Sequence, residues 1–207
     1  MRPDDLTRLE AVTEVVLDDS TGVVAFAVGW PDLETDENRS RLWLADGQGV
    51  RQLTDGHRDT RVRFAPDGSR LAFLRAEPEA NAQPMVLDLE SGDAQTMPGF
   101  AMDGATALEW VGNDTVAVLA AARPAEQVDA TDDELARRPR IIRGLDYRFN
   151  GRGWVHDRRA GVQLVDVATG IRRPLVVPGG DAIDHRAIAP SPDGQSILVV
   201  AASDADA

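Results

Sequence analysis

The chain has 207 residues, of which 43% are hydrophobic, so it can bury a core and is not disordered throughout. Its formal net charge is −13, which argues against a nucleic-acid backbone as partner, because phosphate binding requires clustered positive charge. There is no cysteine, and this excludes disulfides, thiolate metal sites and cysteine nucleophiles.

The N-terminal segment, residues 1–14, has no apolar core flanked by positive charge and therefore does not resemble a secretory signal. No apolar run in the chain approaches the roughly 20 residues that are needed to span a bilayer. We therefore expect a soluble, cytoplasmic protein with neither a membrane nor a nucleic acid among its partners.

Four segments in succession each carry two short apolar strands around a tight turn. In chain order they are 15–28, 62–74, 108–120 and 188–200. Their turns contain Ser20-Thr21-Gly22, Asp67-Gly68, Asn113-Asp114 and Asp193-Gly194. Asp-Gly and Asn-Asp pairs tolerate the positive φ that a tight hairpin demands, so each segment predicts a pair of antiparallel strands.

A second set of segments falls between the hairpins, and each of them reaches an aspartate and then a glycine turn: 41–49, 84–92 and 161–170. The aligned Asp46 and Asp88 lie 42 residues apart, whereas Asp88 and Asp166 lie 78 apart. Four strands in about 42 residues are typical of a β-propeller blade. A β-sandwich, the alternative all-β architecture, would not require this period. The sequence predicts an all-β, partial β-propeller of about three to four four-stranded blades over residues 15–207.

The longer interval places an insertion at about 121–159, in the third predicted blade. Its first part predicts a short helix capped at Thr131 or Asp132, with acidic residues in the first turn. Its second part sets aromatic residues among arginines. We take five of these residues as candidates for contact with a substrate or partner: Arg143, Tyr147, Arg148, Arg152 and Trp154. The alternative is an elongated hairpin whose aromatic residues only pack on the blade.

The sequence shows no catalytic constellation. Its three histidines, His57, His156 and His185, lack the spacing of metal ligands. The repeated aspartates fit backbone bonding at turns better than a calcium loop. None of the seven serines lies in a Gly-x-Ser-x-Gly elbow. We therefore expect no catalytic residue, metal or cofactor in this chain.

Several stretches resemble the N-terminal region of acylaminoacyl-peptidase-like members of the prolyl oligopeptidase family, which are serine peptidases. The resemblance covers nearly the whole chain and includes the 62–74 hairpin and the 147–170 stretch. The matching pieces of the opening region are Asp4-Asp5-Leu6, Asp18-Asp19-Ser20-Thr21-Gly22, Leu42-Trp43 and Gln52-Leu53-Thr54. Ser20-Thr21-Gly22 and Gly112-Asn113-Asp114 depart from the Pro-Asp-Gly usual in the family, although they still form turns.

The resemblance implies a part of a larger enzyme. In the family the propeller is followed by an α/β-hydrolase domain that carries the catalytic Ser, Asp and His, and this sequence does not contain that domain. The implied role is a propeller that gates the access of peptide substrates to the hydrolase domain. Two alternatives remain, a TolB-like propeller scaffold that binds a protein partner and a broken gene product. In either case the terminal blades would expose apolar faces, which predicts self-association or marginal stability.

Overall fold

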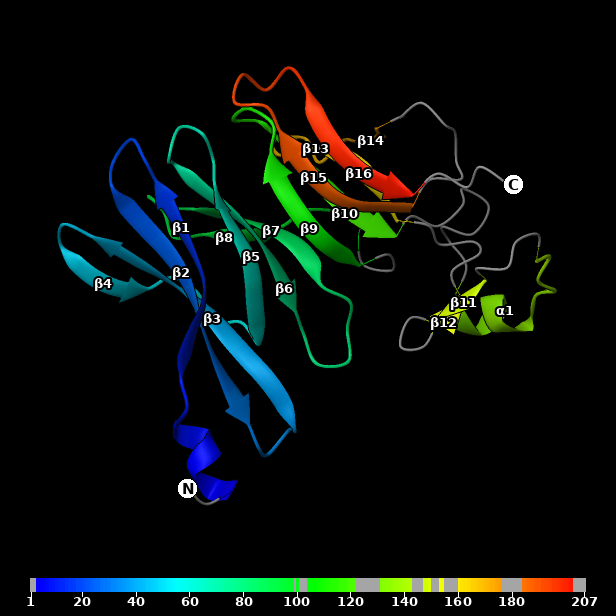
Figure 1. Cartoon of the computed structure of the whole chain (residues 1–207), viewed down its shortest axis with the longest axis horizontal. Helices are drawn as coiled ribbons and strands as arrows, with labels where there is room; N and C mark the ends of the chain where they lie inside the picture. Colours follow the sequence, from blue (N-terminus) through cyan, green and yellow to red (C-terminus); the bar gives the residue numbers. More distant parts are fainter. Residues whose placement is uncertain are drawn as a thin grey trace.

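The computed structural model of the chain describes residues 3–98, 100, 104–121, 131–142, 147–149, 153–154, 160–175 and 184–202 (Figure 1). Within these residues most of the regular structure is β-strand. The two helical segments described are the 3-10 helix η1 (Pro3–Arg8) and the α-helix α1 (Asp132–Arg137). The predicted all-β class is confirmed.

The strands follow one another in antiparallel units of four. The first unit is β1 (Ala11–Asp18), β2 (Val23–Asp32), β3 (Glu37–Asp46) and β4 (Gly49–Gln52). The second is β5 (Arg58–Phe64), β6 (Arg70–Ala76), β7 (Gln83–Asp88) and β8 (Ala94–Thr96). The third is β9 (Ala105–Trp110), β10 (Thr115–Ala121), β13 (Ala160–Asp166) and β14 (Arg172–Pro174). A final hairpin pairs β15 (Asp184–Pro190) with β16 (Ile197–Ala202).

All four predicted hairpins form, as β1–β2, β5–β6, β9–β10 and β15–β16. The first strand begins at Ala11, four residues before the start of the repeat expected from the sequence. One parallel bridge, between Ser40 and Arg58, connects the first unit to the second. A backbone hydrogen bond, from the Ala105 N–H to the Ala82 carbonyl at 2.8 Å, joins the second unit to the third, and most other contacts between units involve side chains.

Burial of both faces of the middle unit holds the array together. On β6, Leu71 and Phe73 pack in one core cluster with the first unit, while Ala72 and Leu74 pack in another with the third unit. On β10, Val118 faces that second cluster, and alternate residues face β15–β16. Because successive strand residues point to opposite faces, one apolar run serves two interfaces.

Each end of the array leaves an apolar surface without a neighbour among the described residues. In the first unit, Val15 and Leu17 are 59% and 54% exposed. In the final hairpin, Leu198 and Val200 are 71% and 55% exposed. These exposures fit the apolar end faces expected from the sequence, and self-association through them stays a prediction.

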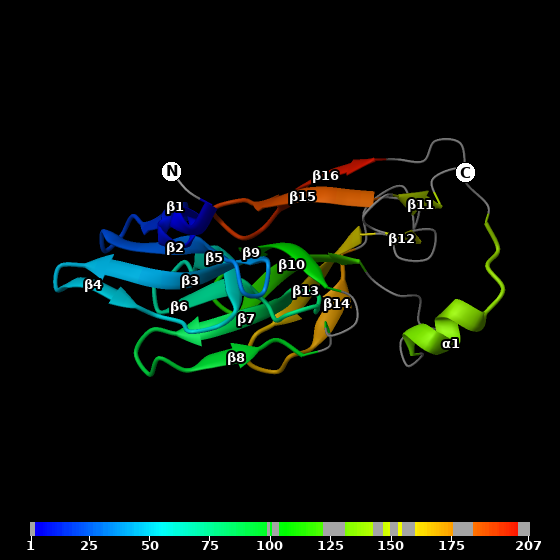
Figure 2. The ribbon, with the colours of Figure 1, turned by 90° about the horizontal axis from the view of Figure 1, so that it is seen from below.

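The insertion joins β10 to β13 and carries α1 and the short pair β11 (Arg148–Phe149) and β12 (Gly153–Trp154). Thr131 caps α1, because its hydroxyl accepts from the Glu134 backbone while the Glu134 carboxylate accepts from the Thr131 backbone. The predicted helix is thus confirmed. Figures 1 and 2 both place α1, β11 and β12 to one side of the sheets.

No helix in the described part of the chain combines the length and the apolar character needed to cross a membrane.

Candidate functional site

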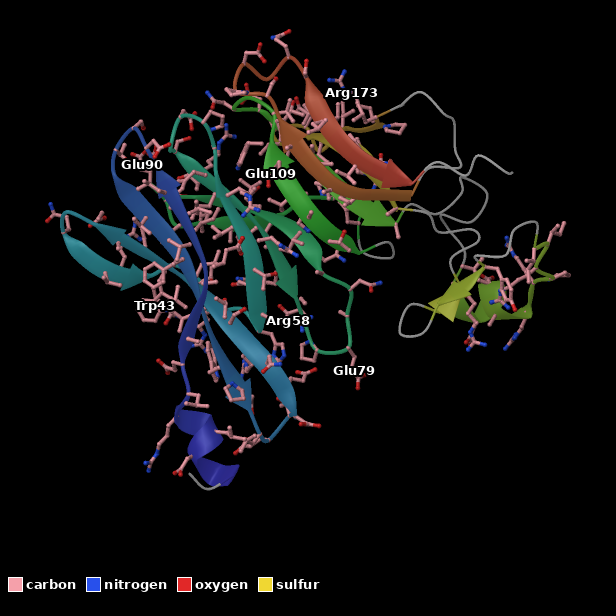
Figure 3. All side chains as sticks on the ribbon, in the orientation of Figure 1. Trp43, Arg58, Glu79, Glu90, Glu109 and Arg173 are labelled. Carbon is pink, nitrogen blue, oxygen red and sulfur yellow. The ribbon has the colours of Figure 1, made fainter. Side chains whose placement is uncertain are left out.

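The first strands of successive units lie side by side: β1 contacts β5, β5 contacts β9, and β9 contacts β15 (Figure 1). A charged network crosses three of them. Glu14 on β1, Arg63 on β5 and Glu109 on β9 meet between the strands, and Figure 3 shows Glu109 in this region. The sequence repeat thus brings one residue from each unit to a common surface.

Arg63 is the centre of this network. Its Nη1 donates to Glu14 Oε1 and its Nε to Glu109 Oε1, each at 2.7 Å. Glu14 Oε2 also accepts from the backbone N–H of Arg61, which has a positive φ of 58°. Burial by itself would lower the pKa of Arg63, but the hydrogen bonds and charges of Glu109 and Glu14 outweigh it, so the pKa is raised. The network therefore keeps a fixed cation between two carboxylates.

A cavity of about 460 Å³ adjoins the network. Arg63, Glu109 and Trp110 line one side of it, and Pro190 at the end of β15 lines the other together with the β15–β16 turn. Trp110 is held in place because its indole Nε1 donates to the carbonyl oxygen of Arg63 at 3.1 Å. The cavity therefore combines an aromatic wall with paired charges.

We expect Arg63→Gln to destabilise the fold by about 1–3 kcal/mol, because two carboxylates would lose a charged donor between adjacent units. The free energy of unfolding in urea measures this loss. A double-mutant cycle with Glu109→Gln is the control, and we expect the two effects to be clearly non-additive. If the losses of unfolding free energy in the two single variants simply added up in the double variant, Arg63 and Glu109 would not be energetically coupled, and the prediction would be wrong.

The hairpin turns contact one another along one end of the array. The backbone N–H of Asp67 donates to Asn113 Oδ1 at 3.1 Å, and Arg70 Nη2 donates to the Asn113 carbonyl at 2.7 Å. A Cβ added at Gly68, whose φ is +72°, would lie 2.6 Å from Asp18 Oδ2. Glycine at position 68 therefore allows the positive φ of the turn, and its lack of a side chain allows Asp18 of the neighbouring unit to approach closely.

The repeated aspartates are turn residues, as the sequence predicts. Asp88 Oδ1 accepts from the backbone N–H groups of Glu90 and Ser91, and Asp166 Oδ1 accepts from the backbone and hydroxyl of Thr169. These hydrogen bonds lower the pKa of both carboxyl groups below the usual value. For Asp88, the largest cause of the lowered pKa is the hydrogen bond from the Ser91 backbone. Hydrogen bonds lower the pKa in the same way at Asp18, Asp67 and Asp193.

These lowered pKa values predict acid sensitivity. Each of these carboxyl groups has a lower pKa in the folded chain than in the unfolded chain, so its ionised form stabilises the fold. This contribution to stability is complete at a pH above the ordinary carboxyl pKa, and it is lost as the pH falls through the pKa of the folded state. We expect the melting temperature to fall below about pH 4. Asp88→Asn should make that fall shallower, whereas Asp19→Asn, at an exposed position, should leave it unchanged. If the melting temperature depended on pH in the same way in Asp88→Asn and Asp19→Asn, the acid sensitivity could not be assigned to the Asp88 carboxyl.

Three of the five predicted contact residues lie in the described part of the insertion. Arg148 and Trp154 are backbone partners in the β11–β12 pair, and Tyr147 immediately precedes it with 39% of its surface exposed. Arg143 and Arg152 lie outside the described residues. The pairing brings the aromatic and basic positions together, and their contact with a substrate or partner stays a prediction.

His57 is a structural residue in this fold. Its Nε2 atom lies 2.6 Å from Glu37 Oε2, and its side chain is 11% exposed. His156 lies outside the described residues, and the backbone of His185 lies in β15. In the described part of the chain, no three His, Asp or Glu residues form a group that could hold a metal ion.

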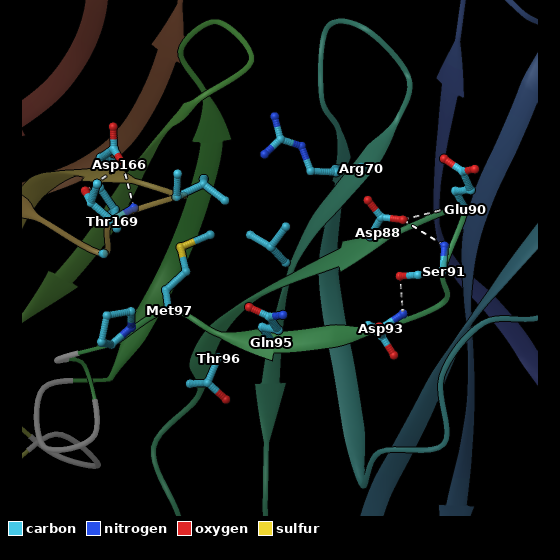
Figure 4. Close-up of a pocket in the computed structure, with 16 residues that line it drawn as sticks. Arg70, Asp88, Glu90, Ser91, Asp93, Gln95, Thr96, Met97, Asp166 and Thr169 are labelled. Carbon is cyan, nitrogen blue, oxygen red and sulfur yellow. Dashed lines mark hydrogen bonds between the residues drawn. The ribbon is translucent and has the colours of Figure 1, made fainter.

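A second and larger cavity lies on the other side of the array, between the second and third units (Figure 4). Its volume is about 800 Å³. Residues from β7, β8 and the turn between them form one wall, and the β13–β14 turn forms the other. Asp88, Glu90, Asp93 and Asp166 stand around an apolar floor that includes Val86 and Met97. We call this the inter-unit groove.

Comparisons with known proteins agree with this architecture. No family model matches the chain. The chain is 25% identical over 200 residues to a Bacillus subtilis protein named uncharacterized peptidase YuxL, covering 94% of this chain and 30% of that protein. It is similar to the structure of an acylaminoacyl peptidase in complex with Z-Gly-Gly-Phe-chloromethyl ketone, with a TM-score of 0.65 and 16% identity over 93% of this chain and 28% of the other. The chain is also similar to the structure of TolB from Acinetobacter baumannii, with a TM-score of 0.58 and 14% identity over 95% of this chain and 39% of the other.

The chain is also similar to the β-propeller domain of the Trilobed protease from Pyrococcus furiosus, with a TM-score of 0.52 and 13% identity over 86% of this chain and 45% of the other, so the described strands have the fold of part of a β-propeller. The resemblance to acylaminoacyl-peptidase-like propellers that the sequence predicts is confirmed. The chain spans about a third of the length of the curated relative that it matches.

Proposed function

We propose that this chain is the N-terminal propeller part of a serine peptidase of the acylaminoacyl peptidase or oligopeptidase type. One observation carries the proposal: similarity over 94% of the chain to a protein named as a peptidase, of which it covers only 30%. The likeness in fold to an acylaminoacyl peptidase, again over part of that enzyme, supports it. The catalytic Ser, Asp and His would belong to an α/β-hydrolase domain elsewhere in the whole protein.

The role of this part is to gate peptide access. In this proposal the three four-stranded units are three blades, and the paired strands β15 and β16 begin a fourth. Their first strands, β1, β5, β9 and β15, surround the axis of the propeller. A ring of such blades over a catalytic cleft admits short or unfolded peptides and excludes folded proteins. The Glu14–Arg63–Glu109 network stiffens the inner edge by joining three blades.

The first test of this proposal is the reading frame beyond the codon for Ala207. We expect further hairpins, then Gly-x-Ser-x-Gly with Asp and His after it. The whole protein should hydrolyse short acyl-peptides and spare folded proteins, and replacing the serine of the elbow by alanine should abolish hydrolysis. A frame that ends after blades alone would refute the enzyme reading.

The alternative function is a TolB-like scaffold that binds a protein partner. The similarity to TolB over 95% of the chain favours it. The two functions differ in outcome, because a scaffold predicts further blades followed by a stop and no peptide hydrolysis.

A further inference from the structure

We propose that the inter-unit groove is a docking site for the arginine-rich insertion of a second copy of this chain. The groove and the C-terminal part of the insertion, residues 137–159, have opposite charge, and each also carries the apolar surface that the other requires. The proposal does not depend on peptidase activity, so it stands or falls separately from the proposed function.

The groove has the shape and floor of a site for an extended segment. Its volume of about 800 Å³ is within the range of ligand pockets. The floor of the groove is the edge of a core cluster. In this cluster Val86, Met97 and Val165 are buried, with no more than 8% of the surface of each residue exposed. An apolar side chain that enters the groove would therefore extend an existing core.

The rim of the groove is negatively charged. Asp88, Glu90, Asp93 and Asp166 contribute four carboxylates, against the single cation of Arg70. The guanidinium of Arg70 is directed to the next turn, where it donates to the Asn113 carbonyl. The exposed Glu90 and Asp93 carboxylates, seen in Figure 4, remain to attract a cation.

The C-terminal part of the insertion, from Arg137 onward, has the opposite character, although the whole segment 121–159, with nine arginines and seven acidic residues, has a net charge of only +2. Residues 137–159 hold eight arginines and two aspartates, a net charge of +6, in a chain whose total is −13. The remaining residues therefore sum to −19. Such a separation of charge within one acidic chain favours contact between the two parts.

The segment after α1 fits the groove in detail. Arg137, Arg138 and Arg140 lie next to Ile141 and Ile142 in sequence. Ile141 is 72% exposed and Ile142 is 44% exposed. Arginines beside two exposed isoleucines match carboxylates around an apolar floor, so one segment can satisfy both features of the groove.

The occupant comes from a second copy because of where the insertion leaves the sheet. The insertion returns to the sheet at Ala160, the first residue of β13, whereas the groove is lined from Val165 onward, near the far end of that strand. Five residues of strand separate these points, or about 17 Å. Both views of the ribbon place α1, β11 and β12 to one side of the sheets, whereas the groove lies between the β7–β8 and β13–β14 turns.

The test is a charge swap on the whole 207-residue chain, followed by sedimentation velocity. Glu90→Arg/Asp93→Arg reverses the groove, and Arg137→Glu/Arg138→Glu/Arg140→Glu reverses the segment after α1. We expect the parent to associate at micromolar concentration and to dissociate as NaCl rises from about 50 to about 500 mM. Each variant alone should associate at least tenfold more weakly, and an equimolar mixture of the two should associate again.

The control for net charge is Glu10→Arg/Asp19→Arg, which makes the same change as the groove variant at two exposed positions, one just before β1 and one in the β1–β2 turn. It should associate like the parent. If a variant loses its cooperative melt, the neutral pair Glu90→Gln/Asp93→Asn replaces it. Association that persists in both charge variants would point to the apolar end faces and overturn the proposal, as would a parent chain that is monomeric at about 500 μM.

Discussion

Arg75→Ala is expected to lower the free energy of unfolding by about 3–5 kcal/mol, because it leaves a buried carboxylate without its cation. Asp59 is 0% exposed, and its two oxygens accept from Arg75 Nε at 2.8 Å and Nη2 at 2.9 Å. The hydrogen bond to Asp59 also raises the pKa of Arg75, so the guanidinium stays charged throughout the accessible pH range. Urea denaturation followed by tryptophan fluorescence measures the loss.

This ion pair also lies at the junction of two units. The Asp59 carbonyl accepts from Ser40 Oγ at 2.6 Å, next to the parallel bridge between β3 and β5. The matched control is Arg39→Ala, because Arg39 makes one contact with Asp32 at 3.2 Å and is 29% exposed, so its loss should cost less than about 1 kcal/mol. A loss of similar size in both variants would contradict the prediction.

An apolar replacement of the pair separates its two contributions. Asp59→Leu/Arg75→Met removes both charges and should recover most of the stability lost in Arg75→Ala. If the double variant were as unstable as the single one, the hydrogen bonds of the pair would matter more than the isolated charge.

Phe73→Ala is the second large effect, with an expected loss of about 3–5 kcal/mol. The Phe73 ring is 0% exposed and lies in the cluster that joins the first and second units, beside Ala25, Leu42 and Leu44. The substitution removes the largest fully buried side chain of that cluster and leaves a cavity. Because neighbouring blades stabilise one another, we also expect the first unit to unfold before the rest.

Two measurements test this prediction. Calorimetry should show a single transition for the parent chain and a broadened or split one for Phe73→Ala. The control Phe73→Leu keeps most of the volume and should cost less than half as much. A single sharp transition in Phe73→Ala, displaced by only a degree or two, would show that the first unit does not depend on this contact.

Much of the fold was predictable because the repeat is encoded locally. Asp67-Gly68 and Asp193-Gly194 form turns for reasons contained in two residues, since glycine adopts a positive φ without strain. The capping box at Thr131 and Glu134 is equally local. Short apolar runs beside tight turns predicted the strands β6 and β10, although they did not show which neighbour each face contacts.

The charged network at the inner strands was not predicted from the sequence. Arg63 and Glu109 each stand four residues before a turn residue, Asp67 and Asn113 respectively. Opposite charges at equivalent positions of adjacent repeats were therefore a usable signal. Glu14 likewise stands four residues before a turn residue, Asp18, but the sequence does not show that it reaches Arg63. In addition, β1 has a register shift between Val12 and Glu14 that only the paired strands reveal.

The sequence by itself determined the strand pairs, their turns, the period and the resemblance to a peptidase propeller, because these depend on residues close together in the chain. Only the tertiary structure decided the Asp59–Arg75 pair, the groove between the second and third units and the network around Arg63. Each of these joins side chains from separate strands, and the network and the groove also join separate units. Their geometry follows from how one blade packs on the next, which no local pattern specifies.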